Sequence, residues 1–183
     1  MNFWISLIGY QLVWFACVIG AGHGLVWPGL LGLALYAAWQ LSCSPSRATD
    51  LKLMAAALLL GSLLDGGLIH VGLARYATAW PLASFVPVWI LALWATFALT
   101  FTQSLKYLQT RLPLASLLGV IGGPLAYLGA ARGWHVVNFA APAWHGLLWL
   151  AIGWGIATPL LAWLARPGLR TAARNPLLQE RAS

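Results

Sequence analysis

The stretch that decides the fold is Leu58-Leu59-Leu60-Gly61-Ser62-Leu63-Leu64-Asp65-Gly66-Gly67-Leu68-Ile69-His70, an apolar run with one carboxylate inside it. It predicts a membrane-spanning helix, the third of six along the chain. An ionised Asp at the centre of such a helix costs about 2.5–3.5 kcal/mol to insert. We therefore expect Asp65 to face the interior of a helix bundle rather than lipid.

The composition agrees with a membrane location. Of the 183 residues, 61% are hydrophobic and 7% are charged, whereas soluble domains carry about 25% charged residues. The net charge of +7 would suggest nucleic acid in a soluble protein. Here the bases lie in loops and in the tail, so membrane topology explains them and no nucleic-acid partner is expected.

Six apolar segments have lengths near the ~20 residues that cross a bilayer. The predicted spans are about 3–20, 26–43, 53–74, 85–104, 114–131 and 143–165. The fold class expected is an all-α membrane protein, a six-transmembrane-helix bundle. Residues 1–166 would form that single transmembrane domain, and 167–183 a basic cytoplasmic tail.

The distribution of bases sets the expected orientation. Two of them, Arg75 and Arg132, fall on one side of the membrane, and the rest share the side of the N-terminus: Arg47, Lys52, Lys106, Arg111, Arg166, Arg170, Arg174 and Arg181. The positive-inside rule then predicts an N-in/C-in chain. In this topology Asp65 lies about 13 Å from the outer end of its helix.

Small residues form a stripe on the fifth predicted helix, at Gly119, Gly122, Gly123, Ala126, Ala130 and Gly133. Small side chains let helix backbones approach closely in lipid. The stripe predicts a helix–helix seam, with a substrate groove as the alternative. A related stripe on the third helix would place Asp65 in a narrow space.

Asp65 is the sharpest functional signal, because intramembrane acids commonly serve as proton relays, ion sites or substrate anchors. We expect it to be a catalytic acid/base or a hydrogen-bonding anchor. The alternative is a neutral Asp that locks the bundle through hydrogen bonds. Gln11, a polar residue in the middle of the first helix, is its predicted partner.

A surface for an apolar ligand is predicted on the fourth helix, where aromatic side chains are crowded around Trp89 and Trp94. Ordinary packing is the alternative. Tyr127 and Arg132 are expected on the same outer side of the membrane as Asp65. The predicted substrate-binding residues are therefore Gln11, Trp89, Trp94, Tyr127 and Arg132. The four histidines match no metal-ligand spacing, so neither a metal nor a cofactor is expected. No catalytic or nucleotide-binding motif shows whether the protein is an enzyme.

Four segments carry a family resemblance: 11–17 (QLVWFAC), 61–65 (GSLLD), 87–97 (PVWILALWATF) and 122–127 (GGPLAY). They resemble the small bacterial membrane family called domain of unknown function 2878. The resemblance implies a multi-pass protein of the bacterial inner membrane with no established activity. It also implies that the gene lies next to genes for fatty-acid-modifying enzymes similar to cyclopropane-fatty-acid synthase.

These observations predict a protein that binds or processes a lipid or another apolar small molecule in an outer-half pocket around Asp65. Its expected partners are membrane lipids and a lipid-modifying enzyme. Two alternatives stay open. One is a small transporter or a proton- or ion-coupled carrier, which would need a polar path through the inner half. The other is an accessory membrane subunit of a lipid-modifying system.

Overall fold

The computed structural model describes residues 3–166, and within them the chain forms an antiparallel helical bundle. Its elements, in chain order, are α1 (Phe3–Gly22), α2 (Trp27–Cys43), α3 (Arg47–His70), β1 (Ala74–Tyr76), α4 (Val88–Thr100), the 3-10 helix η1 (Lys106–Thr110), α5 (Leu112–Trp134), β2 (Val137–Phe139) and α6 (Trp144–Leu164). The predicted tail, 167–183, with Arg170, Arg174 and Arg181, lies outside the described residues.

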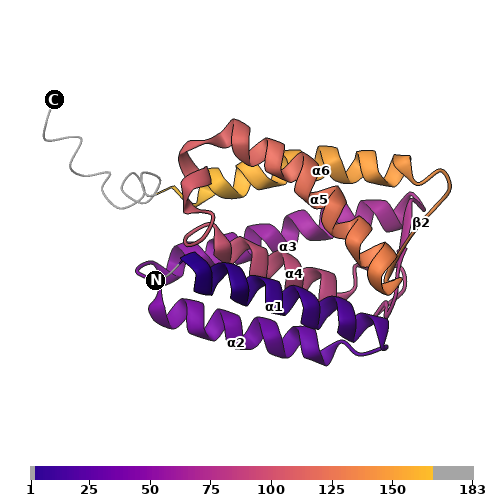
Figure 1. Cartoon of the computed structure of the whole chain (residues 1–183), viewed down its shortest axis with the longest axis horizontal. Helices are drawn as coiled ribbons and strands as arrows, with labels where there is room; N and C mark the ends of the chain where they lie inside the picture. Colours follow the sequence, from indigo (N-terminus) through magenta and orange to yellow (C-terminus); the bar gives the residue numbers. More distant parts are fainter. Residues whose placement is uncertain (1–2, 167–183) are drawn as a thin grey trace, which may run out of the picture.

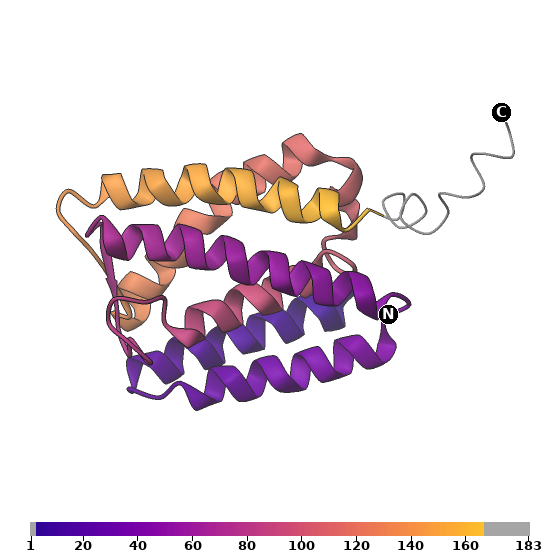
Figure 2. The ribbon, with the colours of Figure 1, turned by 180° about the vertical axis from the view of Figure 1, so that it is seen from behind.

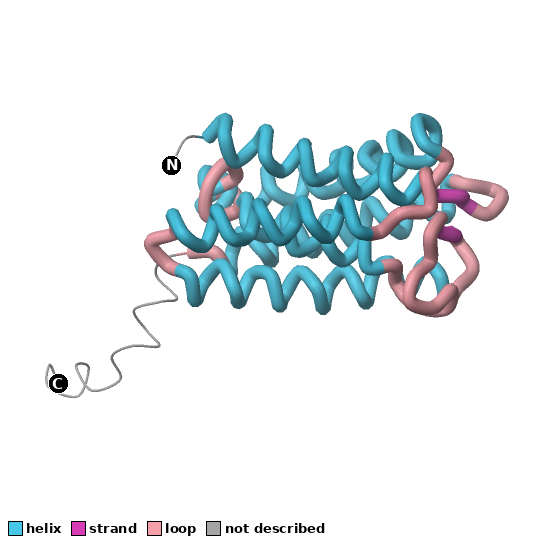
Figure 3. Tube along the Cα trace, turned by 90° about the horizontal axis from the view of Figure 1, so that it is seen from below, coloured by secondary structure: helices cyan, strands magenta, loops and turns pink. Residues whose placement is uncertain are grey.

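Successive helices run in opposite directions between two ends of the bundle (Figures 1 and 2). One end carries β1 and β2, and we call it the sheet end. The other carries Arg47, Lys52, Lys106, Arg111 and Arg166, and we call it the basic end. Figure 3 shows the strands gathered at the sheet end alone. The separation of bases predicted from the sequence is thus present along the bundle axis.

Four helices are long and apolar enough to cross a membrane, namely α1, α3, α5 and α6. Helix α2 has 17 residues and α4 only 13, so length and composition support four spans and not the six predicted. Helix α4 is short because residues after Thr100 form turns and then η1, where a continuous helix to residue 104 was predicted.

The largest difference in boundaries concerns α3, which begins six residues before the predicted start and ends four residues before the predicted end. It begins at Arg47 and ends at His70, where Gly72 adopts a left-handed backbone with φ of 75°. Glycine tolerates this conformation because it lacks a Cβ. Asp65 is therefore only about 7–8 Å from the end of its helix, at 1.5 Å per residue.

A two-stranded antiparallel sheet covers the sheet end, and the sequence pattern did not predict it. The Cα partners are Ala74 with Phe139, Arg75 with Asn138, and Tyr76 with Val137. Side chains alternate along a strand, so Arg75 is exposed while Ala74 and Tyr76 are buried. The sheet thus directs the phenol of Tyr76 into the bundle.

The small-residue stripe of α5 divides into two parts. A Cβ on Gly119 would meet the Trp154 carbonyl, and one on Gly123 would meet the Trp154 indole, so these glycines form the predicted seam with α6. A Cβ on Gly122 would have no neighbour within 4 Å. The stripe is therefore a helix–helix seam on one side and open space on the other.

A proline inside α6 has a specific compensation. Pro159 has no N–H to donate to the carbonyl of Gly155, four residues earlier. The Ser116 hydroxyl of α5 donates to that carbonyl at 2.7 Å. This side chain therefore satisfies a buried acceptor and ties α5 to α6.

Candidate functional site

Asp65 is completely buried, and three side chains donate hydrogen bonds to its carboxyl group. The hydroxyls of Tyr76 and Tyr127 each lie 2.6 Å from Oδ1. The Trp94 indole N–H donates to Oδ2 at 2.7 Å. The donors come from β1, α5 and α4, so four elements of the bundle meet at this one carboxyl group.

The chemistry of the donors constrains the carboxyl group. An indole N–H can only donate, so Oδ2 must accept from Trp94. Burial, followed by the charge of Asp65, raises the pKa of the Tyr76 phenol well above its ordinary value. Tyr76 therefore keeps its proton at neutral pH and remains able to donate. Burying a carboxyl group is costly unless it is paired or hydrogen-bonded, and these three hydrogen bonds offset that cost for Asp65.

Close packing brings Trp94 to this position. A Cβ on Gly61 of α3 would lie 2.5 Å from Cδ1 of Trp94, so only glycine leaves room for the indole there. The indole of Trp154 stacks on the indole of Trp94, with ring centroids 4.1 Å apart. The stripe of small residues around Asp65 thus admits an aromatic ring from α4.

A cavity of about 660 Å³ lies next to this network, between α1, α4 and α5. Its walls are mostly apolar and aromatic, and they include Trp89, Trp94 and Tyr127. Along α1 the lining extends from Leu7 to Val18, which is about 16 Å of helix at 1.5 Å per residue. The volume is in the range of ligand sites, about 300–1,000 Å³, and the shape is elongated along the helices.

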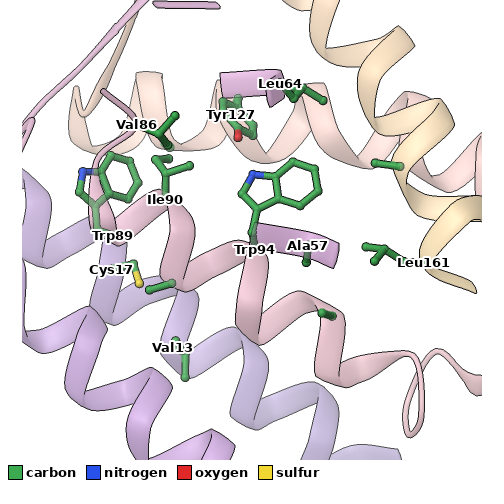
Figure 4. Packing of buried hydrophobic residues seen from close by; sticks show 14 of the residues in the cluster. Val13, Cys17, Ala57, Leu64, Val86, Trp89, Ile90, Trp94, Tyr127 and Leu161 are labelled. Carbon is green, nitrogen blue, oxygen red and sulfur yellow. The ribbon is translucent and has the colours of Figure 1, made fainter. Parts of the chain in front are cut away.

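Asp65 itself is not part of the cavity lining, whereas Trp94 and Tyr127 are. In Figure 4 the indole nitrogen of Trp94 and the hydroxyl of Tyr127 are turned toward one another. The acid therefore lies behind the wall and holds two wall residues through hydrogen bonds. The predicted pocket around Asp65 becomes a pocket beside it.

The predicted site residues are only partly brought together. Trp89, Trp94, Tyr127 and Gln11 all line the cavity. The predicted pairing of Gln11 with Asp65 is not made, because the carboxyl group takes its hydrogen bonds from α4, α5 and β1 instead. Arg132 is exposed in the last turn of α5 and is not part of the lining, since the helix turns its side chain away.

Two residues of the site were not singled out for it from the sequence. Tyr76 lies between the third and fourth predicted spans, and only the pairing of β1 with β2 places it against Asp65. Trp154 lies within the sixth predicted span, and its stacking on Trp94 depends on the tertiary packing of α6. The only sign in the sequence that Tyr76 could contact Asp65 is that it lies eleven residues further along the chain.

A second buried polar cluster lies at the basic end of the bundle. Asp50 and Gln40 are both completely buried, so Asp65 is not the only acid inside the bundle. The Thr102 hydroxyl donates to Asp50 Oδ1 at 2.7 Å, and the Gln40 amide donates to that hydroxyl at 3.3 Å. This cluster ties α2 and α3 to the residues that follow α4.

The four histidines lie at the sheet end, at His23, His70, His135 and His145. Within residues 3–166, no group of three or more His, Cys, Asp and Glu side chains could hold a metal ion. The histidines are therefore distributed over separate helix ends and loops.

Long apolar helices packed around a hydrogen-bonded acid, beside an apolar cavity, define a helical-bundle protein of the membrane class. The chain belongs to the family described as "Protein of unknown function (DUF2878)", whose model matches residues 3–160. The family resemblance found in the sequence is thereby confirmed. No match was found among curated proteins or among solved structures.

Proposed function

We propose that this protein binds a lipid or a similar apolar molecule inside the membrane, in the cavity between α1, α4 and α5. One observation carries the proposal: an elongated cavity of about 660 Å³ with apolar and aromatic walls, open beside Gly122. Such walls suit a hydrocarbon chain, which gains dispersion contacts without losing hydrogen bonds.

Asp65 acts in this proposal as a positioning residue. It holds the Trp94 indole and the Tyr127 hydroxyl by hydrogen bonds, and both of these side chains line the cavity. Because these bonds come from α4 and α5, they fix the distance between two walls of the cavity. A catalytic role would require Asp65 to reach the ligand past these residues.

For its location, we propose the bacterial inner membrane, with six crossings and both termini on the cytoplasmic side. The alternation of all six helices between the basic and sheet ends supports this count, with α2 and α4 as short spans. The concentration of Lys and Arg at the basic end supports the orientation.

Binding is favoured over transport by the residues between the two buried acids. Along α3, the buried positions that separate Asp50 from Asp65 are Leu53, Ala57, Gly61 and Leu64. A carrier for a polar or ionic substrate would need hydrogen-bonding groups through this region. Along α3, the two buried acids are instead separated by apolar packing.

The test is to fill the cavity from Gly122. A Gly122→Phe variant adds a ring where a Cβ meets no neighbour within 4 Å, so the fold can accept it. The matched control is Gly133→Phe, because Gly133 is also on α5 with no neighbour within 4 Å but does not line the cavity. Both proteins are purified in mild detergent, and retained lipid is measured by native mass spectrometry.

We expect the wild type and Gly133→Phe to retain lipid, and Gly122→Phe to retain several-fold less. Equal retention by the two variants, or no retained lipid in any of the three proteins, would rule out the cavity as the binding site.

A further inference from the structure

The basic end of the cavity is formed by the segment between α4 and α5. Ser104, Leu105, Tyr107 and Leu108 all contribute to its lining, so the lining residues stand on both sides of Lys106 in the sequence. Lys106 itself is exposed, and Tyr107 is 43% exposed. The apolar cavity therefore ends next to a cation on the bundle surface.

Two further cations lie close to the same segment. Arg111 is exposed and follows η1 directly, immediately before α5 begins. Arg166, at the end of α6, donates from Nε to the carbonyl of Gln109 in η1 at 2.6 Å. Three positive charges thus lie in or next to a five-residue helix at one end of the cavity.

Protein carboxylates within residues 3–166 do not neutralise these charges. The two acids there, Asp50 and Asp65, are completely buried. Asp50 is hydrogen-bonded to Thr102, and Asp65 is bonded at the other end of α3. The exposed side chains of Lys106 and Arg111 therefore remain available to an anion.

We propose that the ligand is a phospholipid with an anionic headgroup, whose phosphate lies between Lys106 and Arg111 and whose chain lies in the cavity. The inference rests on the proposed function and adds the class of lipid and the direction in which it is bound. Charge complementarity supports it: an acyl chain in the cavity places its headgroup at the membrane interface, where these two bases stand. A zwitterionic lipid carries its own ammonium group and gains less from them.

General attraction of anionic lipids to a basic surface is the rival explanation, and the chain provides a matched control. Arg47 and Lys52 are exposed at the same end on α3 and do not line the cavity. Replacing Arg47 and Lys52 with Gln removes the same charge as replacing Lys106 and Arg111. A surface effect responds equally to both double variants, whereas a headgroup site responds to one.

The experiment measures the relative affinity of phosphatidylglycerol and phosphatidylcholine with brominated acyl chains, which quench tryptophan fluorescence. Trp14, Trp89, Trp94 and Trp154 line the cavity and act as the reporters. Quenching is recorded in mixed micelles for the wild type, both double variants and Gly122→Phe. The cavity-dependent signal is the quenching that Gly122→Phe loses.

We expect the wild type to prefer phosphatidylglycerol, and Lys106→Gln/Arg111→Gln to lose roughly tenfold of that preference. Arg47→Gln/Lys52→Gln should keep most of it. Equal losses in the two double variants would overturn the headgroup site while leaving the cavity as a lipid site. Equal affinity of the wild type for the two lipids would likewise overturn the headgroup site and leave the cavity as a lipid site. The absence of any cavity-dependent quenching would overturn both proposals.

Discussion

The indole rings of Trp94 and Trp154 stack in parallel, with centroids 4.1 Å apart and planes 15° from parallel. Gly61 of α3 makes room for the first ring, and Gly123 of α5 for the second. Two glycines on different helices thus enclose an aromatic pair, and the N–H of Trp94 reaches Asp65. The packing of the bundle and the satisfaction of its buried acid depend on the same residues.

Replacing Asp65 with Asn should destabilise the protein while barely changing its shape. An amide has one oxygen, so it cannot accept from Trp94 and both tyrosines as the carboxyl group does. The expected loss in the free energy of unfolding is about 1–3 kcal/mol, seen as a lower melting temperature in detergent. An Asn variant as stable as the wild type would mean that the three hydrogen bonds are not made.

The two tyrosines offer a matched pair that separates packing from ligand binding. Tyr76→Phe and Tyr127→Phe each remove one hydroxyl from Oδ1, so each should cost about 0.5–1.5 kcal/mol. Only Tyr127 lines the cavity, so only its variant should change lipid retention in native mass spectrometry. If both variants lost lipid equally, the effect would come from stability rather than from contact with the ligand.

Glycine positions on α3 and α5 should respond to alanine in opposite ways. In Gly61→Ala the new methyl group would lie 2.5 Å from the Trp94 ring, and such overpacking costs typically about 1–3 kcal/mol. In Gly122→Ala the methyl group meets nothing within 4 Å, so the gain in helix propensity, about 1 kcal/mol, should appear as a higher melting temperature. Melting curves of the two variants in one detergent test the difference.

Ser116 and Pro159 should be energetically coupled. Ser116→Ala leaves the Gly155 carbonyl without its donor, at an expected cost of about 1–3 kcal/mol. Pro159→Ala supplies a backbone N–H to that carbonyl, so the serine becomes dispensable in this background. A double-mutant cycle on unfolding free energies should give a coupling above ~0.5 kcal/mol. Additive effects would show that the hydroxyl does not serve the proline.

The positions of the helices could be predicted from the sequence. In lipid, an apolar run of membrane length can satisfy its backbone hydrogen bonds only as a helix. The burial of Asp65 followed from the cost of exposing a carboxylate to hydrocarbon. Trp89, Trp94, Tyr127 and Gln11 were selected from the sequence, and they meet in one cavity lining. These expectations depended on single residues and their helix, which a sequence contains directly.

What the sequence could not provide was the pairing of groups distant in the chain. The partner of Asp65 was expected to be Gln11, but the bundle brings Tyr76, Trp94 and Tyr127 there instead. Three-residue strands carry too short a pattern to be recognised, so the position of Tyr76 was not foreseen. The length of α4 was overestimated because the residues after Thr100 form turns instead of continuing the helix.

The dependence of Tyr76 on the β1–β2 pair has a consequence for biogenesis. The ribosome delivers α3 with its acid long before it delivers Tyr127 and the strand that pairs with β1. A nascent chain that has inserted only its first four helices therefore exposes an incompletely paired Asp65. Only when α5 and the strand after it have been made are Tyr127 and the partner strand of β1 present, so the buried acid is fully hydrogen-bonded only after most of the chain has been made.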